Sequence, residues 1–154
     1  MRAHLESTAD INKRDLLRFG GRSVLQEASF FNNNETVEAI LGFSEHSLDV
    51  NQGSFLGKDT ALHFAIANCN KDVAFNLLQH GADPNKRNKY GETPLHLCTD
   101  KGVASLLVTF GASVTCKDKK LRTPIEHALS RGYDNNSDVF KFLVEIQDSA
   151  RINK

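Results

Sequence analysis

The sequence predicts an all-α repeat protein, in which helix–turn–helix units stack and loops project to one side. The first observation is a phrase that occurs three times, as Thr60-Ala61-Leu62-His63, Thr93-Pro94-Leu95-His96 and Thr123-Pro124-Ile125-Glu126. The second is its spacing, since the first two copies begin 33 residues apart. The third is that a second apolar run follows each copy. Self-similarity at this period is typical of stacked units, none of which can bury its own apolar face.

The first two segments depart most from the repeat. Leu16-Leu17-Arg18-Phe19-Gly20 is similar to the end of a second helix, so residues 1–21 are expected to be a capping helix or a loosely attached tail. In a degenerate first unit, residues 22–51, the run from Ser23 to Ala28 replaces the phrase. Its second helix is predicted from Glu35 to Leu41, before Gly42.

The two central units, residues 52–85 and 86–115, are the most regular. Thr93 is a good N-cap and Pro94 suits the first helical position, where its missing N–H costs nothing. We expect a break near Asp100-Lys101-Gly102 and a second helix from Val103 to Phe110. Gly111 then ends that helix in the left-handed conformation.

The last unit, residues 116–147, is degenerate again. Helices are predicted from Thr123 to Ala128 and from Val139 to Val144, joined by a lengthened loop. Glu126 stands where the first two phrases have histidine. Residues 148–154 are expected to be a frayed tail.

The end of each second helix carries the most specific signature. In the second unit it reads Leu77-Leu78-Gln79-His80-Gly81-Ala82-Asp83-Pro84-Asn85. Together with the repeated phrase, this signature closely resembles the ankyrin repeat over about residues 51–145, and more loosely over residues 22–50. The resemblance implies an ankyrin solenoid of about four repeats, with degenerate ends and projecting β-hairpin or finger loops.

Catalytic patterns do not stand out in this sequence. His63 and His96 belong to the repeated phrase, and the resemblance implies that they are hydrogen-bonded within the scaffold. Cys98 takes an alanine-like position and is expected to be a small core residue. Zinc-ligand spacings and a glycine-rich phosphate loop are missing. We therefore predict no enzyme activity, no cofactor and no metal.

Composition limits the expected class of partner and the expected cellular compartment. The chain has 154 residues, net charge zero and no run of about 18 apolar residues, so neither nucleic acid nor a membrane is an expected partner. The N-terminus lacks a signal-peptide core, and the three cysteines show no paired spacing. We expect an intracellular monomer in the cytoplasm, with the nucleus or a host cell as alternatives.

The resemblance implies that a protein partner binds the concave face, which fingertips and first helices line. The fingers are residues 51–59, 85–92 and 115–122, and the second and third are basic. Phe55 is either an exposed anchor or folds back over the first unit. The lysines either contact the partner or only keep the loops solvated. The predicted partner-binding residues are Phe55, Leu56, Lys86, Arg87, Lys89, Tyr90, Lys117, Lys119, Lys120 and Arg122.

These residues predict a partner with an acidic surface and an apolar pocket, bound by a non-catalytic scaffold. One alternative is an inhibitor-type module that blocks an enzyme or transcription factor, with a pathogen effector acting in a host cell as one form of it. Another alternative is an enzyme with an unrecognised site. Leu77 and Asp83 also place Asn85 in the context of asparagine hydroxylation known in ankyrin repeats. The other interpretation of Asn85 is purely structural.

Overall fold

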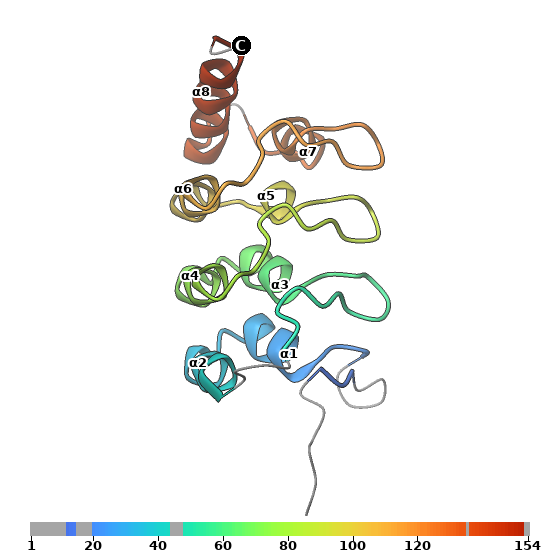
Figure 1. Cartoon of the computed structure of the whole chain (residues 1–154). Helices are drawn as coiled ribbons and strands as arrows, with labels where there is room; N and C mark the ends of the chain where they lie inside the picture. The colour runs from blue at the N-terminus through green and yellow to red at the C-terminus, as the bar shows by residue number, and fades with distance from the viewer. Residues whose placement is uncertain (1–11, 15–19, 44–47, 135, 153–154) are drawn as a thin grey trace, which may run out of the picture.

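The computed structural model describes residues 12–14, 20–43, 48–134 and 136–152 of the chain. Over these ranges the protein is a stack of helix pairs (Figure 1). The helices described are α1 (Val24–Phe30), α2 (Asn34–Phe43), α3 (Ala61–Ala67), α4 (Lys71–Gln79), α5 (Pro94–Leu97), α6 (Lys101–Thr109), α7 (Pro124–Ser130) and α8 (Asp138–Ile152).

The helices form two columns, with finger loops projecting from one side (Figure 1). The first-helix column contains α1, α3, α5 and α7, and the second contains α2, α4, α6 and α8. A finger precedes each of α3, α5 and α7, and in the described part of the chain these fingers contain no extended strand. The predicted all-α repeat architecture is thus confirmed, with fingers that are closed turns and not β-ladders.

Each first helix begins at a capping box built from the first and fourth residues of the repeated phrase. In α1 the Ser23 N–H donates to Gln26 Oε1 at 2.9 Å, and in α7 the Thr123 N–H donates to Glu126 Oε2 at 2.7 Å. Histidine rings accept the corresponding N–H in α3 and α5. An N-cap of this kind stabilises a helix by about 1 kcal/mol. The phrase recurs because every unit must start a helix at the same place.

Asparagine side chains bond the ends of the first and second units to the unit that follows each. Asn85 Nδ2 donates to the Gly111 carbonyl at 2.9 Å, and its Oδ1 accepts the Ser113 N–H at 2.8 Å. Asn51 makes the equivalent pair of bonds to the loop after α4, at 3.1 and 2.7 Å. The same pair of bonds is thus made at Asn51 and at Asn85. Asn85 therefore has a structural role, independent of any hydroxylation.

The core lies between the two columns and continues through the whole stack. Its largest fully buried apolar side chains are Leu62, Ile66, Leu77, Leu95, Leu107 and Leu143. Cys98 is buried as predicted, and burial raises the pKa of its thiol to about 12. Since each unit packs only on its neighbours, stability is a sum of unit and interface contributions.

Two helix boundaries differ from the sequence prediction. Helix α2 continues through Gly42 to Phe43, so Gly42 does not end it. Helix α5 stops at Leu97, and Cys98 turns into an extended conformation. The Asp100 side chain then accepts the Val103 N–H at 2.9 Å and caps α6, which places Lys101 and Gly102 inside that helix and not in the break.

The last helix is longer than predicted. Helix α8 runs from Asp138 to Ile152, whereas the sequence pattern indicated an end near Val144 and a frayed tail from residue 148. Beyond Val144 the apolar spacing weakens, but Ile146 still packs on the core and the Ser149 hydroxyl bonds the Glu145 carbonyl at 2.7 Å. The sequence lacks proline and glycine there, so nothing interrupts the helix.

The expected N-terminal capping helix centred on Leu16 and Leu17 lies outside the described residues. None of the helices that the structure describes is both long and apolar enough to cross a membrane.

Candidate functional site

Each finger loop is a tight turn organised by one buried polar side chain. Asn88 Oδ1 accepts the N–H groups of Tyr90 and Glu92, at 2.9 and 3.0 Å. In the third finger Asp118 Oδ1 accepts the N–H groups of Lys120 and Arg122, at 2.8 and 3.0 Å. Such side-chain bonds fix the backbone of a turn. The fingertips are therefore built as defined projections.

The Asp118 carboxylate is charged and fully engaged. Arg122 donates to its Oδ2 from Nη2 at 2.6 Å and from Nε at 2.9 Å. Burial alone would raise the pKa of Asp118, but the bonds from Arg122 and from the Lys120 amide outweigh it and lower the pKa to about 2. Arg122, a predicted partner-binding residue, thus has a structural role in its own finger.

Backbone hydrogen bonds also link neighbouring fingers. The Lys89 N–H donates to the Gly57 carbonyl at 2.8 Å, and the Lys119 N–H donates to the Tyr90 carbonyl at 2.9 Å. Arg87 adds a side-chain bond from Nη2 to the Lys117 carbonyl at 2.6 Å. The row of fingers is consequently one connected platform.

The two histidines of the phrase connect consecutive units, as the resemblance implied. His63 Nδ1 accepts the Thr60 N–H at 3.2 Å, so the ring proton is on Nε2, which donates to the Glu92 carbonyl at 3.1 Å. His96 makes the same bond to the next finger, at 3.1 Å. Burial lowers the pKa of both rings. They are neutral structural groups whose two nitrogens are both occupied.

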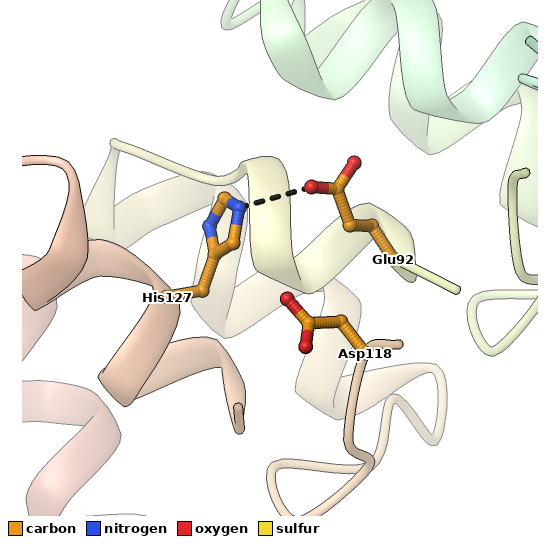
Figure 2. A group of neighbouring side chains, drawn as sticks. All are labelled: Glu92, Asp118 and His127. Atoms are coloured by element: carbon orange, nitrogen blue, oxygen red, sulfur yellow. Dashed lines mark hydrogen bonds and ion pairs between the residues drawn. The ribbon is translucent and has the colours of Figure 1, made fainter. Parts of the chain in front are cut away.

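A cluster of Glu92, Asp118 and His127 lies where the second and third fingers meet α7, as Figure 2 shows. One ligand atom from each residue lies within 4.8 Å of the others, and His127 Nε2 donates to Glu92 Oε1 at 3.0 Å. A divalent cation here would compete with Arg122, whose guanidinium already neutralises Asp118. We interpret the cluster as a hydrogen-bonded joint between units.

Two adjoining hollows line the side of the fingers that faces the first-helix column, and we call them together the inner groove. The first, of about 350 Å³, is lined in part by Leu56, Lys89 and Tyr90 of the fingers and by Phe64 of α3. These side chains bring an apolar surface and a cation together in one concave site.

The second hollow of the inner groove, of about 410 Å³, shares Tyr90 with the first. Lys119, Lys120 and Arg131 contribute positive charge to it, while His127 lines it from α7. The inner groove therefore runs along the stack from the first finger to the third. Arg131 was not among the predicted residues.

The remaining predicted residues lie elsewhere. Phe55 is 56% exposed and lines a separate hollow of about 360 Å³, together with Lys86 and Arg87. The side of the first finger at Phe55 is tied to the chain before α1, because the Phe55 N–H donates to the Gly21 carbonyl at 2.9 Å. That Phe55 is a partner anchor stays a prediction. Phe55 and Leu56 face different hollows, and Lys117 is exposed but lines none of the three. The predicted residues form two sites and not one.

One exposed residue of the third finger was missed by the sequence reasoning. Leu121 is 72% exposed and has a positive φ of 61°. Gly91 has the corresponding place in the second finger, with φ of 78°. The sequence signal was available, because a leucine stands where another copy of the turn has glycine.

A stacked helical array with a row of fingers and a long groove defines a class of repeat protein that presents an extended surface. A family model described as ankyrin repeats, in three copies, matches residues 2–88 and 68–154. The chain belongs to the ankyrin repeat family. Ankyrin repeats generally mediate protein–protein interaction, and the match indicates no catalytic family.

Several ankyrin repeat proteins are similar to the chain. FPV031 of Fowlpox virus is 32% identical over 143 residues, which cover 88% of this chain and 40% of that protein. YahD of Escherichia coli is 32% identical over 119 residues, covering 73% and 57%. A Rickettsia felis protein is 33% identical over 84 residues, covering 47% and 37%. The chain thus spans between 37% and 57% of the length of these relatives.

Proposed function

We propose that this chain is a non-catalytic scaffold that binds a protein partner along the inner groove. The observation that carries the proposal is the groove itself, where Leu56 and Tyr90 provide apolar surface and Lys89, Lys119 and Lys120 provide charge. A central apolar anchor with charged neighbours is the common composition of a protein-binding hot spot.

The rigidity of the fingers supports this role. Lys89 and Lys119 each donate a backbone N–H to the preceding finger, so their side chains project from a fixed frame. Binding to a preformed surface costs less ordering entropy than binding to free loops. A partner would therefore meet a ready-made array of contacts.

The charge of the groove favours an acidic partner. Lys89, Lys119 and Lys120 are exposed, whereas the acidic side chains of the groove are bonded within the chain: Asp118 to Arg122, Glu92 to His127 and Asp59 to Asn88. The positive charges are the ones that face outward. Complementary charge raises the association rate and selects among partners.

A second contact region is the hollow with Phe55, Lys86 and Arg87. It combines an exposed aromatic ring with two exposed cations, as the inner groove does. We place the inner groove first, since it extends along more of the stack.

The inhibitor-type role is the second candidate. The observation that favours it is the trimmed third unit, in which α5 has only four residues. An inhibitor uses the same groove as a scaffold does. Stoichiometric loss of the captured partner's activity would distinguish an inhibitor from a scaffold that only holds its partner.

Two further proposals concern the setting of the protein. Cys69, Cys98 and Cys116 are unpaired, which fits a monomer in a reducing compartment such as the cytoplasm.

Asn85 is a proposed site of hydroxylation, although both ends of its side-chain amide are already bonded. Mass spectrometry of the protein from its own cells decides whether Asn85 gains an oxygen.

The test of the main proposal is affinity capture from a lysate of the source cells. The wild type is compared with a Lys89→Glu/Lys119→Glu variant and with a Lys101→Glu/Lys141→Glu control. The control reverses two exposed charges in the second-helix column, away from the fingers. Circular dichroism verifies that all three proteins are folded.

We expect proteins that the wild type and the control retain and the groove variant loses. Equal retention by all three would contradict binding through the inner groove. Turnover of a substrate by the purified chain would overturn the non-catalytic role.

A further inference from the structure

We propose that the tip of the third finger is the anchor of the interface, with Leu121 packed against apolar side chains of an extended, acidic segment of the protein partner. This inference rests on the protein-binding function proposed above and specifies it. It follows from the backbone of Leu121, from its exposure and from the charges around it.

The turn forces Leu121 into a backbone conformation that leucine disfavours. Asp118 accepts the N–H groups of Lys120 and Arg122 through its side chain and that of Leu121 through its carbonyl, the last at 3.0 Å. The Asp118 N–H also donates to the Arg122 carbonyl, which closes the loop. The resulting φ of 61° is unfavourable for residues other than glycine, asparagine and aspartate.

The second finger shows that the same turn works without a large side chain. Asn88 makes the equivalent bonds there, and Gly91 has the positive φ. A Cβ on Gly91 would come within 2.9 Å of the Lys119 backbone nitrogen, so glycine is required at that place. The first finger has Lys58 at a positive φ of 56°, with a polar side chain. Leucine is needed for none of these turns.

Leu121 gains nothing from packing to offset this conformation. Its side chain is 72% exposed, the highest value among the exposed large apolar residues described. A strained residue that persists where the fold over-determines it is a mark of a functional position. Its apolar side chain is explained if a partner covers it.

The neighbours of Leu121 indicate what that partner carries. Lys119 and Lys120 precede it and are exposed, and Arg131 lines the same hollow as these lysines. The carboxylate of the same turn, Asp118, is buried and paired with Arg122. Leu121 itself lines none of the three hollows, so it projects beside the inner groove and not into it. An exposed apolar residue that follows two exposed lysines fits an acidic segment that also carries apolar side chains. A nucleic acid would use the cations but would leave the leucine without a function.

The experiment selects binders from a displayed library of random dodecapeptides with the wild-type protein. The best peptide is synthesised, and its Kd is measured by fluorescence anisotropy. The variants are Leu121→Asn and Leu121→Gly, which remove the apolar side chain and suit a positive φ. The matched control is Leu129→Gln, at another exposed leucine. A Lys119→Glu/Lys120→Glu variant is compared with Lys141→Glu.

The selected peptides are expected to combine acidic and apolar residues. The Leu121 variants and the double lysine variant should each weaken binding roughly tenfold or more, as for a hot-spot residue. The two controls should bind as the wild type does. The melting temperature of the Leu121 variants should be unchanged or higher, because the strain is removed.

Other results would overturn the anchor. If the Lys89→Glu variant bound the peptide more weakly than the wild type and the Leu121→Asn variant did not, the role of Leu121 would be refuted. The inner groove would then remain the binding site. A lower melting temperature of both Leu121 variants would show a structural role. Selection without enrichment, or salt-sensitive binding of a single-stranded oligonucleotide that ignores Leu121, would also refute the anchor.

Discussion

Replacement of His63 tests how the units of this protein are joined. His63→Ala removes the bonds to the Thr60 N–H and the Glu92 carbonyl, and the side chain is only 1% exposed. Each hydrogen bond contributes about 1 kcal/mol net, and a buried amide left unsatisfied costs about 1–3 kcal/mol. The expected loss of about 3 kcal/mol is large beside a typical stability of about 5–15 kcal/mol.

The chain itself supplies the comparison residues. Gln26 makes the bonds of His63 in the first unit. Its Oε1 accepts the Ser23 N–H, and its Nε2 donates to the Gln52 carbonyl at 2.7 Å. His63→Gln should therefore cost less than about 1 kcal/mol. Glutamate is the residue that the fourth unit has at this place, Glu126, and its carboxylate accepts the N–H of the N-cap residue Thr123. A carboxylate has no N–H to donate to the Glu92 carbonyl, so His63→Glu should cost at least as much stability as His63→Ala.

The assay is urea unfolding of the wild type and the three variants, followed by circular dichroism. Since the linear-extrapolation slope reports exposed area, a shared slope allows the midpoints to be compared directly. Glutamine as harmful as alanine, or glutamate as mild as glutamine, would refute the assigned hydrogen bonds. The same series at His96 is an independent repetition.

Three further predictions follow from the structure. Because burial lowers the pKa of His63 and His96 in the folded state, the unfolded chain takes up protons first as pH falls below its histidine pKa of about 6.5. The histidine contribution to stability should then be constant above that pH and fall below it by up to about 1.4 kcal/mol per pH unit for each histidine, as urea unfolding at several pH values near neutrality and below can check. Asp118→Asn should cost about 1–2 kcal/mol in thermal unfolding, because Asn88 builds the same turn without the ion pair. The buried Cys98, with its raised pKa, should resist iodoacetamide at neutral pH until the protein unfolds, whereas the other two cysteines react; mass spectrometry identifies the modified residues.

The repeat architecture was predictable because the same local requirement recurs. A phrase that begins with Thr93 and Pro94 specifies a helix start by capping alone, so position along the stack hardly matters. The trimmed third unit was harder. The end of α5 depends on Cys98 turning into an extended conformation, and the start of α6 on the Asp100 side chain, neither of which the apolar pattern contains.

The candidate site was predictable in composition but not in layout. Phe55 and Leu56 are adjacent in sequence, and only the path of the first finger sends them to different hollows. Glu92 was not singled out at all, because its contacts are far apart in the sequence. Its hydrogen bonds to His63 and His127 depend on the way whole units stack.

Glu92 lengthens the block of the protein that folds together. Its carbonyl is bonded by His63 of the preceding unit, and its carboxylate by Asn88 of its own unit and His127 of the following one. In a linear array with only nearest-neighbour contacts, melting can start at either end and proceed unit by unit. Glu92 strengthens both interfaces of the third unit, so partial states in which either interface is open are costly. Amides of the second, third and fourth units should therefore exchange with deuterium in one common event.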